Sequence, residues 1–101
     1  MPGISDAAPS VRGVEPYRVP FLFDRSRAPI YRLVNVGSET VRGVTVTLIG
    51  AGVMPANRPI ALAPTEALEV VIRGHDLARS SAIVVRWLRE SGEDYVWRTA
   101  F

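Results

Sequence analysis

Apolar and polar residues alternate along several short segments of the chain, which is the pattern of half-buried β-strands. In the segment 41–50, for example, Val44, Val46 and Leu48 share one face, and the threonines between them share the other. Glycine, proline and other turn residues separate the segments. The pattern predicts seven strands, over residues 17–24, 30–36, 41–50, 60–63, 67–73, 82–91 and 95–101. Seven short strands at such intervals are typical of a sandwich or barrel.

Three further features refine this prediction. Pro20 has no N–H to donate to a ladder, so the first strand is expected at a sheet edge. Residues 74–81 interrupt the alternation and predict one helical turn capped by Asp76. Residues 1–15 are rich in glycine, proline and alanine without periodicity. They predict a flexible N-terminal tail, followed by one domain over residues 16–101.

The last two segments each carry a row of large apolar side chains, which includes Trp87 on the first and Tyr95 and Trp97 on the second. A two-residue turn centred on residues 92–93 would pair Trp87 with Arg98 and place the two rows on opposite faces. A loop of three or five residues shifts the pairing by one and brings both rows to the same face. Burying a large aromatic side chain stabilises by about 1.5–3 kcal/mol, more than turn types differ. We therefore predict an odd-length loop with both tryptophans facing inward.

The composition limits the chemistry that the chain can perform. It has no cysteine, which excludes disulfides and thiolate metal sites, and its single histidine leaves only scattered carboxylates for a transition metal. His75, Asp76, Ser80 and Ser81 are the residue types of a hydrolytic triad, but neighbours in one loop diverge and do not form a relay. The sequence therefore predicts a solvated loop there, with no enzyme activity, no cofactor and no metal.

Charge and hydropathy bear on partners and location. All twelve basic residues are arginines, a bias typical of a GC-rich bacterial genome, and the formal net charge is only +2. Acidic residues interleave with the arginines, so no basic stripe for nucleic acid is expected. No apolar run approaches the roughly 18 residues that span a bilayer, and no secretory signal opens the chain. The chain is expected to be cytoplasmic if it is the whole native protein, and extracytoplasmic if it is an excised module.

A series of short motifs between residues 30 and 90 resembles bacterial immunoglobulin-like modules of the cell-adhesion-related and fibronectin-III-like type. The motifs are Leu33-x-Asn35-x-Gly37, Val44-x-Val46-x-Leu48, and Leu62-Ala63-Pro64 leading into Leu68-x-Val70-x-Ile72. The resemblance implies an all-β fold, an immunoglobulin-like two-sheet antiparallel sandwich of about seven strands, in which Asn35 bonds loop backbone. It also implies an adhesion, spacer or interaction role. The chain departs from the pattern at Thr65, where glycine is usual, and lacks the Cys–Trp–Cys framework and the tyrosine corner.

With the aromatic rows inward, the opposite face of the last two strands carries apolar residues flanked by arginines. This candidate partner surface consists of Val84, Arg86, Leu88, Val96 and Arg98. Protein interfaces favour this mixture, whereas scattered valines on a solvent face are also ordinary. We therefore expect a non-enzymatic interaction or scaffold module that binds another protein, or itself, through this sheet face. Two alternatives remain: an accessory or regulatory domain that completes an enzyme on another chain, and a carbohydrate-binding sandwich, which requires Tyr95 or Trp97 to face solvent.

Overall fold

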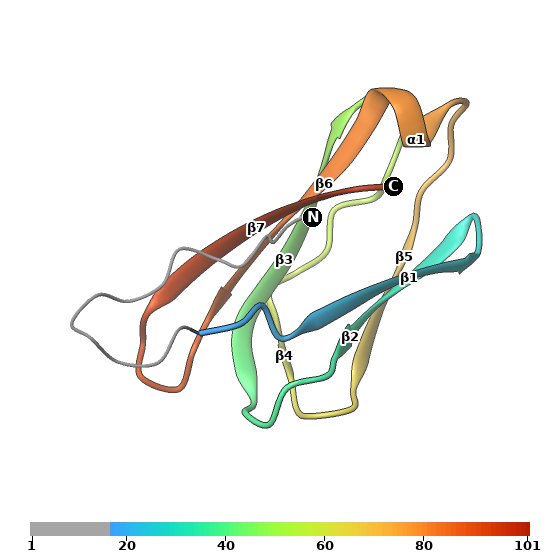
Figure 1. Cartoon of the computed structure of the whole chain (residues 1–101). Helices are drawn as coiled ribbons and strands as arrows, with labels where there is room; N and C mark the ends of the chain where they lie inside the picture. Colours follow the sequence, from blue (N-terminus) through green and yellow to red (C-terminus); the bar gives the residue numbers. More distant parts are fainter. Residues whose placement is uncertain (1–16) are drawn as a thin grey trace.

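Residues 17–101, the part of the chain that the computed structural model describes, form two antiparallel sheets packed face to face (Figure 1). The tail expected at residues 1–15 lies outside them. The elements are β1 (Phe21–Arg27), β2 (Ile30–Asn35), β3 (Val41–Gly50), β4 (Ile60–Leu62), β5 (Ala67–Val71), α1 (Leu77–Ser80), β6 (Ser81–Leu88) and β7 (Asp94–Ala100). All seven segments predicted from the alternation contain a strand. The prediction of an all-β, two-sheet antiparallel sandwich is confirmed.

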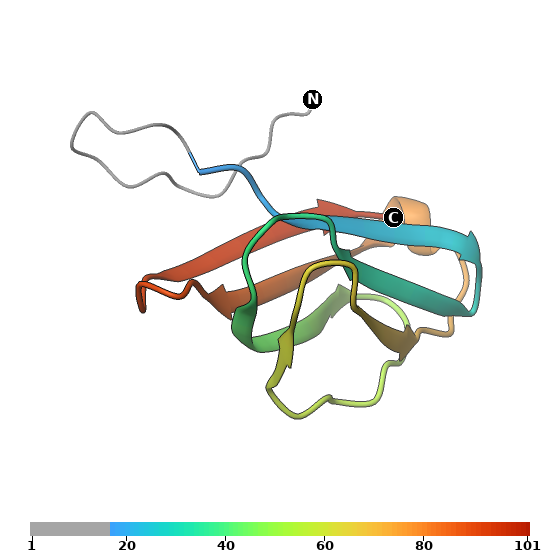
Figure 2. The same ribbon diagram turned by 90° about the horizontal axis from the view of Figure 1, so that it is seen from below.

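One sheet has three strands in the order β1-β2-β5, and the other has four in the order β4-β3-β6-β7. Figure 2 shows the two layers, with β1 and β7 on the same side of the molecule. The edge position predicted for the first strand is confirmed, although β1 begins at Phe21 rather than at Tyr17. Pro20 lies just before β1, and its carbonyl accepts a hydrogen bond of 2.8 Å from the N–H of Val36.

The core lies between the sheets and is built from the apolar side of each alternating strand. Its most deeply buried members include Leu33, Val41, Val44, Ile72, Ile83, Val85 and Trp87. Aromatic rings fill the space around them: the ring of Trp87 meets Phe21 edge-on at 5.0 Å and stacks with Tyr95 at 5.7 Å. Offset and edge-on pairs of this kind add to the stabilisation that burial supplies.

The β6–β7 hairpin has the predicted register. Trp87 pairs with Tyr95 and Val85 with Trp97, so both aromatic rows face the core. Residues 89–93 connect the strands, and a hydrogen bond from the N–H of Arg89 to the carbonyl of Glu93 leaves a three-residue turn at 90–92, of odd length as predicted. The N–H of Gly92 donates to the carbonyl of Arg89, and Gly92 has a φ of 91°. A tight turn that ends in a left-handed residue is a common three-residue hairpin closure, and glycine adopts that conformation without steric cost.

Two turns differ from what the sequence predicts. Asp76 stands at the N-cap of α1, but the expected side-chain cap is wrong: its φ is 55° and its carboxylate makes no cap bond. The backbone carbonyl of Asp76 instead accepts the hydroxyl of Ser80 at 2.8 Å. Thr65 replaces the usual glycine of the resembled motif, yet it takes a left-handed φ of 74°. Its N–H donates to the carbonyl of Asn35 at 2.8 Å, and this bond holds the β-branched residue in that strained conformation.

Candidate interaction surface

The five residues of the candidate partner surface lie together on the outer side of the four-stranded sheet. Val84 pairs with Arg98 and Arg86 with Val96 across the hairpin, and Leu88 follows at the loop end of β6. Leu88 is 39% exposed and Val96 is 50% exposed. The structure therefore brings the predicted residues into one patch, which we call the β6–β7 face (Val84, Arg86, Leu88, Val96 and Arg98).

Strand β3 extends this patch in a way that the sequence did not reveal. Thr45 pairs with Arg86 and Thr47 with Val84, so both threonines continue the β6–β7 face toward the middle of the sheet. The alternation in β3 already assigned the threonines to one face of that strand. That β3 neighbours β6 depends on pairing between segments about forty residues apart, which no local pattern encodes.

The two arginines of the β6–β7 face differ in their ion pairing. Nη2 of Arg86 lies 3.2 Å from Oδ2 of Asp94, and both side chains are exposed. Exposed pairs of this kind contribute about 1 kcal/mol or less, so Arg86 can exchange Asp94 for another carboxylate at little cost. Among residues 17–101, Arg98 has no ion-pair partner. The face thus offers apolar side chains beside two guanidinium groups that are available to acceptors.

A second cluster closes the end of the sandwich where the chain enters β1. The guanidinium of Arg89 binds the carboxylate of Glu39 through two contacts, Nη2–Oε2 at 2.6 Å and Nε–Oε1 at 3.3 Å. The same guanidinium lies 4.0 Å from the ring centre of Tyr17, whose hydroxyl accepts the indole N–H of Trp87 at 3.0 Å. These four residues form the Arg89 cluster, and three of them, Tyr17, Glu39 and Arg89, line a hollow of about 500 Å³. The sequence offered no sign of the cluster, because its members come from three separate segments.

The electrostatics of the Arg89 cluster follow from these contacts. The hydrogen bond from Arg89 lowers the pKa of Glu39, and the same bond raises the pKa of Arg89 further above its usual range. Partial burial raises the pKa of Tyr17. Each charged or polar group is satisfied by another member of the cluster. Together these contacts hold Tyr17 against the β6–β7 hairpin.

Replacing Glu39 with glutamine is expected to weaken the dependence of stability on pH in acid. The folded pKa of Glu39 is lowered, so its stabilisation is present above the unfolded-chain pKa and is lost as the pH falls through the folded pKa. Urea unfolding from about pH 7 to about pH 3 measures this as a loss on the order of 1 kcal/mol that is absent in the variant. Glu69→Gln, an exposed position on β5, is the matched control. If wild type and Glu39→Gln lost the same free energy of unfolding on acidification, the assignment would be contradicted.

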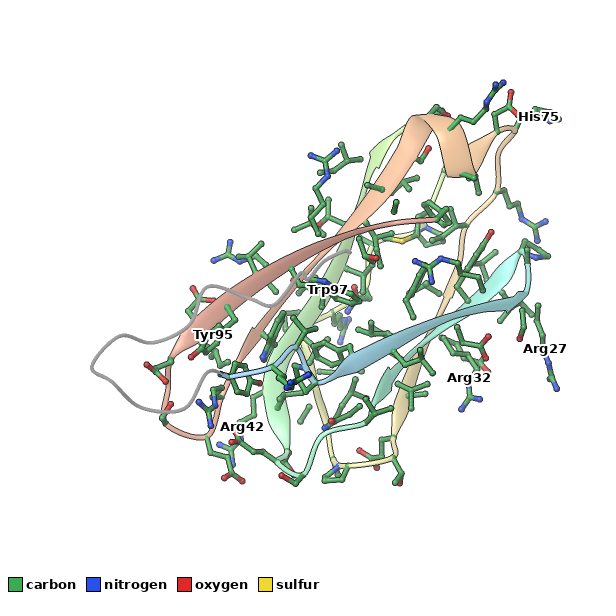
Figure 3. The ribbon with its side chains drawn as sticks, viewed as in Figure 1. Arg27, Arg32, Arg42, His75, Tyr95 and Trp97 are labelled. Atoms are coloured by element: carbon green, nitrogen blue, oxygen red, sulfur yellow. The ribbon has the colours of Figure 1, made fainter. Side chains whose placement is uncertain are left out.

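The side chains that resemble a hydrolytic triad do not bond to one another. His75 is exposed and lies at the outer tip of the loop before α1, away from Tyr95 and Trp97 (Figure 3). The hydroxyl of Ser80 donates to the backbone of Asp76 and that of Ser81 to the backbone of Ala51. The loop brings no hydroxyl within hydrogen-bond distance of the imidazole among the described residues.

The aromatic platform that carbohydrate binding would require does not form at the hairpin. Tyr95 is buried, and Trp97 is partly buried and packs against the core. Both side chains belong to the inner face of β7, as the register dictates.

No three His, Cys, Asp or Glu side chains gather in a metal-binding arrangement between residues 17 and 101. Within the same part of the chain, no helix is long and apolar enough to cross a membrane. Comparison of the chain with protein-family models, with curated proteins and with solved structures finds no match.

Proposed function

We propose that this domain is a non-enzymatic protein-interaction or scaffold module that binds a protein partner through the β6–β7 face. The observation that carries the proposal is the grouping of exposed apolar side chains, Leu88 and Val96, with the guanidinium groups of Arg86 and Arg98 on one sheet face. Arginine is enriched at protein interfaces, and apolar side chains dominate their buried centres.

We also propose that the domain is an immunoglobulin-like sandwich of the fibronectin-III kind. The order β1-β2-β5 matches strands A, B and E of such domains, and β3, β6 and β7 match C, F and G. The remaining strand, β4, lies beside β3, where variable-type and related sandwiches place an added strand of the CFG sheet. Sandwiches of this type serve many different functions. The similarity in strand order therefore supports an interaction role by analogy.

The surface also indicates the partner's chemistry. Burying the remaining exposed area of Leu88 or Val96 against a partner contributes on the order of 1 kcal/mol each to the free energy of binding. Arg98 pairs best with a carboxylate, because its planar guanidinium donates two parallel hydrogen bonds to one. A protein surface with an apolar centre and acidic groups beside it therefore fits the β6–β7 face.

Replacing Leu88 with glutamate is expected to weaken partner binding by about tenfold or more, because a carboxylate then enters the apolar centre. Leu22→Glu is the matched control: Leu22 lies on β1 in the other sheet and is 56% exposed. A protein captured by wild type and by Leu22→Glu, but not by Leu88→Glu, is purified and its affinity measured by calorimetry. A partner that binds all three proteins equally would rule out this face. If the partner is an enzyme, the module is its accessory domain.

A further inference from the structure

The free edge of β7 carries backbone groups that the described residues leave without a backbone partner. The N–H of Arg89 donates to the carbonyl of Glu93 at the loop, which places residues 89 and 93 at a hydrogen-bonded position of the β6–β7 ladder. Such pairs alternate along an antiparallel ladder, so Tyr95 and Trp97 bond to β6, while Asp94, Val96 and Arg98 direct their N–H and C=O groups to the edge.

Contacts at the far end of β7 agree with this alternation. The carbonyl of Ala100, next in the same series, accepts a hydrogen bond from the guanidinium of Arg25 on β1. That contact covers only the last residue of β7. Within residues 17–101, no backbone group bonds to Asp94, Val96 or Arg98 from the edge side.

We propose that β7 pairs antiparallel with β7 of a second copy of this chain, with Val96 opposite Val96 of the second copy. The two-fold axis then passes between the two valines, as a closed two-fold dimer requires. Asp94 of each copy lies opposite Arg98 of the other. All three residue pairs are of the hydrogen-bonded kind, so each exchanges both of its backbone bonds across the edge.

The charges on β7 select this register. Asp94 and Arg98 stand two residues on either side of Val96, on the same outer face of the sheet, so the antiparallel arrangement matches opposite charges twice. Sliding one strand by two residues removes both charge pairs. Sliding it by four places Arg98 opposite Arg98, or Asp94 opposite Asp94, and like charges directly opposite are destabilising.

Two of the other sheet edges are less suited to such pairing. Strand β4 has three residues, and the β1–β2 ladder is interrupted between Asp24 and Arg27. Short and bulged edges are features by which proteins avoid edge-to-edge association. The β6–β7 ladder, in contrast, keeps one register from Asp94 to Ala100. The dimer would join two four-stranded sheets into one continuous sheet and would set two β6–β7 faces side by side. It goes beyond the proposed function, because the strands pair through backbone groups at the edge of β7, although Val96 and Arg98 belong to both the edge and the face.

Charge reversal at the edge tests the pairing. Sedimentation of the full chain over about 1 μM to 1 mM is expected to show a monomer–dimer equilibrium, which Asp94→Arg or Arg98→Asp weakens by about tenfold or more. Each variant places like charges opposite each other in its homodimer. A mixture of the two variants restores both opposite-charge pairs and is expected to form a heterodimer. Arg58→Asp, an exposed position before β4 at the other side of the sheet, is the control.

A single cysteine tests the register directly. The chain has no native cysteine, and hydrogen-bonded pairs have Cα atoms about 5.5 Å apart, within disulfide range. Val96→Cys is expected to cross-link into a dimer under mild oxidation faster than Leu22→Cys, which is exposed on β1. A monomeric wild type at all concentrations, no heterodimer from the mixed variants, or equal cross-linking of both cysteine variants would each overturn the proposal. Partner binding scored with Leu88→Glu is measured separately, so the proposed function and the dimer can fail independently.

Discussion

Replacing Trp87 with alanine is expected to lower the free energy of unfolding by about 3–5 kcal/mol. The side chain is 1% exposed and is among the largest that the core buries fully. The substitution removes contacts with Phe21 and Tyr95 and the hydrogen bond to the hydroxyl of Tyr17. A cavity remains between the sheets, because a close-packed core relaxes only partially around a deleted side chain.

Urea or thermal unfolding followed by circular dichroism measures this loss. Trp97→Ala is the matched control, because Trp97 also lies on the inner face of the hairpin but is only partly buried. It is expected to lose about half as much as Trp87→Ala or less, in proportion to the smaller area that it withdraws from water. Equal losses at the two positions would contradict the inferred packing. Trp87→Phe keeps an aromatic ring and is expected to fall between wild type and alanine.

Replacing Asn35 with alanine is expected to cost about 2–4 kcal/mol, although it removes only a small side chain. Asn35 is fully buried. Its Nδ2 donates to the carbonyls of Glu39 and Leu62, both at 2.9 Å, and its Oδ1 accepts the N–H of Gly37 at 2.9 Å. Alanine would leave these three backbone groups without that partner; the bond to Leu62 is buried, and those to Glu39 and Gly37 are partly buried. A buried unpaired group costs about 1–3 kcal/mol.

Asn57→Ala serves as the matched control. Asn57 also bonds backbone on both sides, to the N–H of Val46 at 2.9 Å and the carbonyl of Val44 at 3.1 Å, but it is less buried. Water can replace part of what its side chain supplies, so a smaller loss is expected. Chemical denaturation of both variants, at matched pH, makes the comparison. A loss for Asn35→Ala no greater than that for Asn57→Ala would contradict the larger role assigned to the buried Asn35 side chain.

Much of this fold follows from local sequence. The period of two predicted the strands because each strand has one face in the core and the other in solvent. The register of the last hairpin was predictable for the same reason, since only an odd-length loop turns Trp87 and Tyr95 to one side. The role of Asn35 followed from the resemblance, and its hydrogen bonds to loop backbone confirm it. The five residues of the β6–β7 face were predictable as the other side of that register.

The tertiary structure decided what depends on pairing between distant segments. It placed β3 beside β6, joined Glu39 to Arg89, and left β7 at a sheet edge with Asp94, Val96 and Arg98 directed outward. Alternation along one strand specifies which of its faces is buried but does not specify which strand pairs with it. Strand order is therefore fixed only when the whole core is packed. The sequence by itself determined the strands, their inward faces and the outer face of the last hairpin, and only the packed sandwich decided the strand order and which edge is open to a partner.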